Sequence, residues 1–233
     1  MGRLFCVRVV GNTNKAICKG YAVGTSVLAQ IAMFSAYVEK VELTAINIVK
    51  PSVIVGLLIG GIVSFAFCSL LIKAVGKAAS KMIEEVRRQF KEIPGLREGK
   101  AKPDYARCVD ISTRAALKGL LVPSIISVIV PLGVGFILGA EAVGGLIVGN
   151  IATVLPLALM LMHSGTAWDN AKKYIERNFW VKGTPTHAAA VIGDTVGDPC
   201  KDTAGPSLDI LINIIGSVAL LFASSFVAYA LLA

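Results

Sequence analysis

Charge is scarce in this sequence. Only 16% of its 233 residues are Asp, Glu, Lys or Arg, whereas a soluble globular domain usually carries about 25%. Hydrophobic residues make up 55% of the chain. This balance favours a membrane protein over a soluble one.

Cysteine and histidine are few and scattered. The five cysteines form no CxxC pair, so neither a disulfide framework nor a zinc site is indicated. They stand at positions 6, 18, 68, 108 and 200. The two histidines, His163 and His187, are also isolated, and we interpret them as ordinary residues rather than metal ligands.

Several motifs for nucleotide or metal chemistry are absent. The chain has no GxxxxGK[ST] loop, no GxGxxG that opens a helix after a strand, and no HExxH. These absences argue against a nucleotide-driven pump of the P-loop kind.

Long apolar segments dominate what is present. Five segments reach the roughly 20 residues that a spanning helix needs: about 20–38, 52–75, 117–139, 142–168 and 205–232. They predict an all-α membrane protein with about five transmembrane helices in a single membrane domain, residues 1–233. Four GxxxG pairs predict close helix packing in lipid: Gly20/Gly24, Gly56/Gly60, Gly135/Gly139 and Gly145/Gly149.

The basic residues lie almost entirely on one side of these spans. The segment before the first span, residues 73–118 and residues 172–201 together hold 21 of the 23 Lys and Arg, leaving only Lys40 and Lys50 opposite. The positive-inside rule makes that side, with the connections at about 76–116 and 169–204, cytoplasmic. The net charge of +8 therefore needs no nucleic-acid partner to explain it.

The charged connections show patterns of their own. Apolar residues at helical spacing over 75–86 predict that the second span continues as a helix into the cytoplasm. Pro and Gly over 92–108 predict a loop before the third span, and a tight turn is expected at Ala140–Glu141.

Three charged clusters stand at the cytoplasmic ends of the spans. Helical spacing places the members of each on one face: Asn12, Lys15 and Lys19; Asp169, Lys172 and Lys173; and Asp194, Asp198 and Lys201, with Asp202 one step round. Carboxylates suit Mg²⁺, and lysines suit phosphate oxygens. A solvated rim explains any one cluster, but three matched clusters favour a magnesium–phosphate site.

The motifs that carry these clusters resemble the membrane-integral, ion-pumping inorganic pyrophosphatases. GDTVGDPCKDTAGPSL (193–208) resembles the family's last-helix signature and AWDNAKKYIE (167–176) its penultimate one. Residues 84–118 and GNTNKAICKGYAVGTS (11–26) also match, so the resemblance covers the chain from about Gly11 onward.

The resemblance implies that this chain corresponds to the last five helices of a subunit of about sixteen spans. In the family this subunit forms a homodimer in the lipid bilayer. It implies hydrolysis of Mg²⁺-pyrophosphate on the cytoplasmic side, coupled to outward ion movement. By position it assigns Asp169, Asp198 and Asp202 to Mg²⁺, with Asp198 and Asp202 catalytic and Asp202 helping to polarise the attacking water. It assigns Lys172, Lys173, Lys201, Asp194 and Asn12 to the substrate site.

Three positions bear on the pumped ion. Lys15 stands where potassium-independent members of the family carry Lys, which implies a proton pump. Asn213 stands at the ion-gate position, where many members have Lys, and Asp209 stands where many have Asn.

The resemblance also predicts an incomplete pump, because the family's first eleven spans have no counterpart here. We expect little activity from the chain alone, and rank a truncated gene or fragment first. The alternative is a non-catalytic scaffold or split subunit that pairs with a separate N-terminal half. A solute permease is disfavoured, because the conspicuous charge lies at the helix ends rather than at mid-membrane.

Overall fold

The computed structural model describes the backbone of residues 2–178 and 182–232, with all side chains there except those of residues 2–9, 12, 15, 16 and 178. These ranges form helices: α1 (Gly2–Lys40), α2 (Pro51–Glu92), α3 (Tyr105–Leu138), α4 (Ala140–Asn178), α5 (Pro185–Pro199), the π-helical turn η1 (Cys200–Ala204) and α6 (Gly205–Tyr229). Five helical stretches, with α5 to α6 counted as one, are long and apolar enough to cross a membrane. The predicted all-α membrane fold is confirmed.

The helices are longer than a bilayer requires. α2 has 42 residues, whereas about 20 span the hydrocarbon core. The predicted continuation of the second span is therefore confirmed, and both long connections are mostly helical. The loop predicted at 92–108 is shorter than expected: α3 already begins at Tyr105, because the Asp104 side chain accepts a hydrogen bond from the Arg107 amide and caps the helix.

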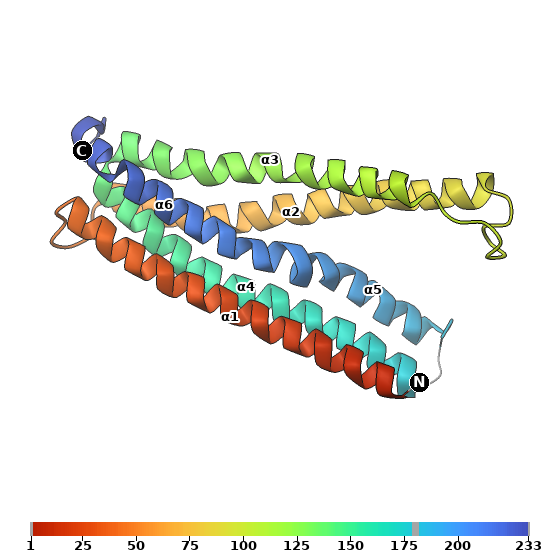
Figure 1. Ribbon diagram of the computed structural model, residues 1–233. Coiled ribbons are helices and arrows are strands. Elements are labelled where there is room, and N and C mark those ends of the chain that lie inside the picture. Colours follow the sequence, from red (N-terminus) through yellow and green to blue (C-terminus); the bar gives the residue numbers. More distant parts are fainter. Residues whose placement is uncertain (1, 179–181, 233) are drawn as a thin grey trace.

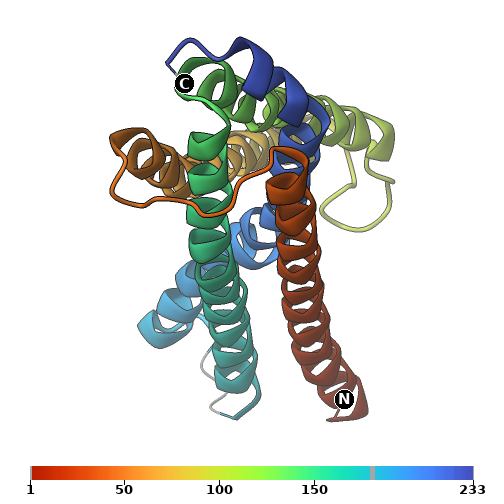
Figure 2. The same cartoon turned by 90° about the vertical axis from the view of Figure 1, so that its left-hand side faces the viewer.

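α4 lies at the centre of the bundle and contacts every other helix. The N-terminus, the α2–α3 loop, the end of α4 and the start of α5 lie at one end of the molecule (Figure 1). The C-terminus and the α1–α2 connection lie at the other. Viewed from that second end, α1 and α4 run beside each other while α2 and α3 diverge from them (Figure 2). The predicted alternation of connections is therefore observed.

Two of the GxxxG pairs, Gly56/Gly60 of α2 and Gly145/Gly149 of α4, lie in the interface between these two helices. A Cβ atom at Gly60 would lie 2.1 Å from the Leu146 carbonyl oxygen, and one at Gly149 would lie 2.1 Å from that of Leu57. The helix backbones are therefore in direct contact, which only glycine allows at these positions.

The other two pairs do not bring helix backbones together. Gly135 faces the ring of Phe226, and no neighbour lies within 4 Å of a Cβ at Gly24. Gly139 links α3 to α4 with a φ of 88°, one residue before the turn expected at Ala140–Glu141. A positive φ suits glycine, so this residue provides the turn.

Candidate functional site

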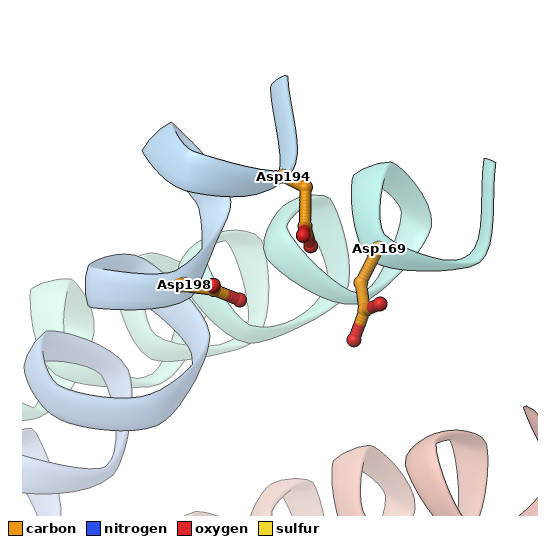
Figure 3. Close-up of side chains that lie close together, drawn as sticks. All are labelled: Asp169, Asp194 and Asp198. Carbon is orange, nitrogen blue, oxygen red and sulfur yellow. The ribbon is translucent and has the colours of Figure 1, made fainter. Parts of the chain in front are cut away.

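Four aspartates gather where α4, α5 and η1 meet beyond the apolar part of the bundle. Asp169 comes from α4, Asp194 and Asp198 from α5, and Asp202 from η1. The first three carry carboxylate oxygens within 4.8 Å of one another and point into a shared space (Figure 3). The structure thus brings together the two predicted clusters of α4 and α5.

Lys201 lies at the centre of these carboxylates. Its ammonium donates to Asp169 at 2.7 Å and to Asp198 at 2.5 Å. Oxygens of Asp194 and Asp202 lie 3.9 and 4.0 Å from it. The Lys201 side chain is only 8% exposed, so its ammonium group is stabilised by the surrounding carboxylates and not by solvent.

Three further lysines surround the cluster. They pair with the carboxylates as follows: Lys173 with Asp169 at 2.7 Å, Lys172 with Asp194, and Lys19 with Asp202 at 2.8 Å. Four carboxylates therefore face four ammonium groups, and each charge has a partner of opposite sign. Lys19 lies on α1, so this helix contributes to the site although Lys19 and Asp202 are more than 180 residues apart in the sequence.

The π-helical turn explains how Lys19 is held. The Gly205 amide donates to the carbonyl of Cys200, five residues back, instead of to that of Lys201. The Lys201 carbonyl is thereby released from the helix and accepts a hydrogen bond from the Lys19 ammonium at 2.9 Å. Pro199 and Pro206, which carry no amide hydrogen, flank this turn and favour the irregularity.

One oxygen of the cluster has no hydrogen bond. Asp194 Oδ1 is buried and lacks a hydrogen-bond partner within the described part of the chain. A buried, unsatisfied carboxylate oxygen is costly unless a ligand or ion completes it. Hard oxygen donors that converge in this way fit Mg²⁺ better than a soft metal.

The remaining predicted residues lie partly elsewhere. Asn12 and Lys15 are on α1, but their side chains lie outside the described residues. Asn213 is not in the cluster. It lies on α6, where its amide donates to Ser26 Oγ at 3.3 Å and to Asp209 Oδ1 at 3.0 Å.

Two contacts of these polar residues could not be predicted from the sequence. Lys19 shares the helix face of the α1 cluster, but nothing in the spacing indicated its bond to Asp202. Ser26, which donates to Asp209, gave no signal at all, because a serine in an apolar helix is common.

Comparison with known proteins places the chain among its relatives. The sequence model of the inorganic H⁺ pyrophosphatase family matches residues 7–222. A K⁺-insensitive pyrophosphate-energised proton pump of Methanosarcina mazei is 52% identical over 216 residues, which cover 91% of this chain and 32% of that protein. A K⁺-stimulated pyrophosphate-energised sodium pump of Thermotoga maritima is 47% identical, over 93% of this chain and 32% of that protein.

The chain spans about a third of the length of these curated relatives. Five spanning helices and homology to membrane pumps identify an integral, multi-pass membrane protein. Because the family model covers nearly the whole sequence and about half of the aligned residues are identical, the chain belongs to the inorganic H⁺ pyrophosphatase family.

Proposed function

We propose that these 233 residues form the C-terminal part of a pyrophosphate-energised, K⁺-independent proton pump and supply one wall of its Mg²⁺-pyrophosphate site. The observation that carries the proposal is the cluster of four aspartates and four lysines with the unsatisfied Asp194 Oδ1. The relatives include both proton and sodium pumps, so the proton type rests on Lys15.

The proposed roles are those that the resemblance to the family assigns, and the charges and positions of the residues support them. Asp169, Asp198 and Asp202 would hold Mg²⁺, which when bound would offset the charge of the phosphates. Lys172, Lys173 and Lys201 would turn from their carboxylate partners to the phosphate oxygens, since an ammonium binds either anion. Asp194 and Asn12 would complete the substrate side. The side chain of Asp198 is about half exposed and that of Asp202 about one-third exposed, so water can reach both carboxylates. These two residues would therefore orient the water for its attack.

The ion would pass from this site between α1 and α6. Asn213, with Asp209 and Ser26, forms a polar group below the cluster on that route. The complete pump would be a homodimer with its active site on the cytoplasmic side.

A chimera tests the proposal. The corresponding third of the Methanosarcina mazei relative is replaced by this chain, and pyrophosphate hydrolysis and proton uptake are measured in vesicles. We expect Mg²⁺-dependent hydrolysis, which Asp198→Asn lowers by at least about 100-fold because a group that orients water is lost.

Asp110→Asn provides the control, because Asp110 pairs with Arg114 on the exposed face of α3, away from the cluster. Its activity should equal that of the unsubstituted chimera. An active Asp198→Asn variant, or equal loss in both, would contradict the assigned roles.

A further inference from the structure

The interface between α1 and α6 carries a row of polar groups through the apolar bundle. We call this row the α1–α6 seam. It comprises, from the charged cluster inward, Lys19 with Asp202, Ser26 with Asp209 and Asn213, Gln30 opposite Gly216, and Met33 with Ser217. Gln30 lies eleven residues after Lys19, which places it about 16 Å deeper along the helix axis and near mid-membrane.

The Gln30 side chain is sealed and unpaired. The residue is 0% exposed, and neither its amide nitrogen nor its amide oxygen has a hydrogen-bond partner among the described residues. Both atoms are closed to water in this arrangement. An amide without partners in an apolar interior is unfavourable, because it has given up its bonds to water and gained none.

The partner helix is shaped around this amide. A Cβ atom at Gly216 would lie 2.0 Å from the Gln30 amide oxygen, so only glycine lets α6 close on it. Val27, one turn before Gln30 on α1, and Ile215, next to Gly216 in the sequence, are buried and apolar. Gln30 and Gly216 therefore form a tight contact that closes the row of polar groups at this depth.

An open, shallow groove lies along α6 near this closure. It has a volume of about 360 Å³ and is lined by Ile210, Asn213, Ile214, Ser217 and Val218, of which Asn213 and Ser217 are the seam residues on either side of Gly216. A small separation of α1 from α6, or a rotation of the Gln30 side chain, would bring the amide to this space. Water there would restore both a donor and an acceptor bond.

We propose that Gln30 is a gating residue: it closes the α1–α6 seam against Gly216, and water that binds its amide opens the seam to the transported ion. The inference rests on the proposed transport function. A neutral amide that both donates and accepts suits a water molecule rather than a bare cation, and an apolar residue there would leave the constriction dry.

Hydrogen–deuterium exchange of side-chain amides tests the opening in this chain itself. The protein is labelled with ¹⁵N in its Gln and Asn side chains, embedded in bilayers and transferred to D₂O. Asn150 is the matched control, since it is also 0% exposed but donates to Ser64 at 3.0 Å across the glycine-closed α2–α4 interface. Gln30→Leu and Asn150→Ala assign the two signals.

We expect the Gln30 amide to exchange at least about tenfold faster than that of Asn150, because no hydrogen bond has to break. Equal or slower exchange at Gln30 would overturn the proposal. This result does not depend on catalysis, so it stands whether or not the chimera hydrolyses pyrophosphate.

Transport by the chimera tests the role. Gln30→Leu should lower the protons moved per pyrophosphate hydrolysed by about tenfold while hydrolysis continues, and Gln30→Asn should restore most of the ratio. An unchanged ratio in Gln30→Leu would overturn the gating role. Absence of hydrolysis in the unsubstituted chimera would instead count against the proposed function.

Discussion

At the scale of single residues, Lys201 decides the state of the site. One ammonium that is 8% exposed contacts two carboxylates directly and has two more within 4.0 Å. Such a group holds together carboxylates that would otherwise repel one another. It also lies among the carboxylates that are proposed to hold a divalent cation, so cation binding would be coupled to release of Lys201.

Replacing Lys201 by Met should therefore destabilise the chain and make it responsive to Mg²⁺. We expect a loss of about 3 kcal/mol, the lower end of the cost of removing one partner of a buried ion pair, because Asp198 is half-exposed. Added Mg²⁺ should raise the melting temperature more in the variant than in the unsubstituted protein. Thermal unfolding in detergent with and without Mg²⁺ measures both effects.

Lys100→Met is the control for that experiment, because Lys100 is exposed in the α2–α3 loop. Its stability and its response to Mg²⁺ should match those of the unsubstituted chain. If Lys201→Met behaves like this control, the central role of Lys201 is wrong.

Much of the cluster could be predicted from spacing within one helix. Asp194, Asp198 and Lys201 share a face because residues three and four apart do so on any α-helix. The bond from Lys19 to the Lys201 carbonyl could not be predicted in this way. It depends on how α1 crosses η1 and on the single amide that skips one carbonyl in the π-helical turn.

At the scale of the helices, the contact between α2 and α4 depends on glycine. Gly60→Ala would place a methyl group 2.1 Å from the Leu146 carbonyl oxygen, and the two helices would have to separate. We expect a loss of about 2 kcal/mol, within the usual range for overpacking. Unfolding by SDS or heat in mixed micelles measures it.

Gly133→Ala is the opposite case in the same fold. A Cβ at Gly133 meets nothing within 4 Å, so the substitution should stabilise α3 by up to about 1 kcal/mol through helix propensity. Equal effects of the two substitutions would show that backbone contact does not hold α2 to α4.

Helix ends were harder to predict than spans. Hydropathy marks where a helix is apolar, and each of the five apolar segments lies on one long helical stretch of the structure. It does not mark where a helix stops once the sequence becomes polar, which is why α3 begins at Tyr105 rather than near residue 117. The GxxxG spacing predicted close packing but not which pairs meet, since that depends on the neighbouring helix.

At the scale of the whole molecule, the pairing of charges argues against activity of the chain alone. The four lysines are already paired with four carboxylates, so Mg²⁺ and pyrophosphate would have to displace these ion pairs in order to bind. We expect no Mg²⁺-dependent hydrolysis above background from the isolated 233 residues in bilayers, assayed by phosphate release. Robust turnover would show that one wall suffices.

The two ends of the molecule also differ in charge, and this difference predicts its orientation. The end with the α2–α3 loop carries most of the basic residues, so it should face the cytoplasm, whereas the α1–α2 connection should face outward. Single cysteines test this in a chain whose native cysteines are replaced by Ser. Lys100→Cys should react with an impermeant maleimide only in inside-out vesicles, and Val49→Cys, on a residue that is 84% exposed, only in intact cells. The reverse pattern would place the carboxylate cluster outside, away from a cytoplasmic supply of pyrophosphate, and would contradict the proposed direction of pumping.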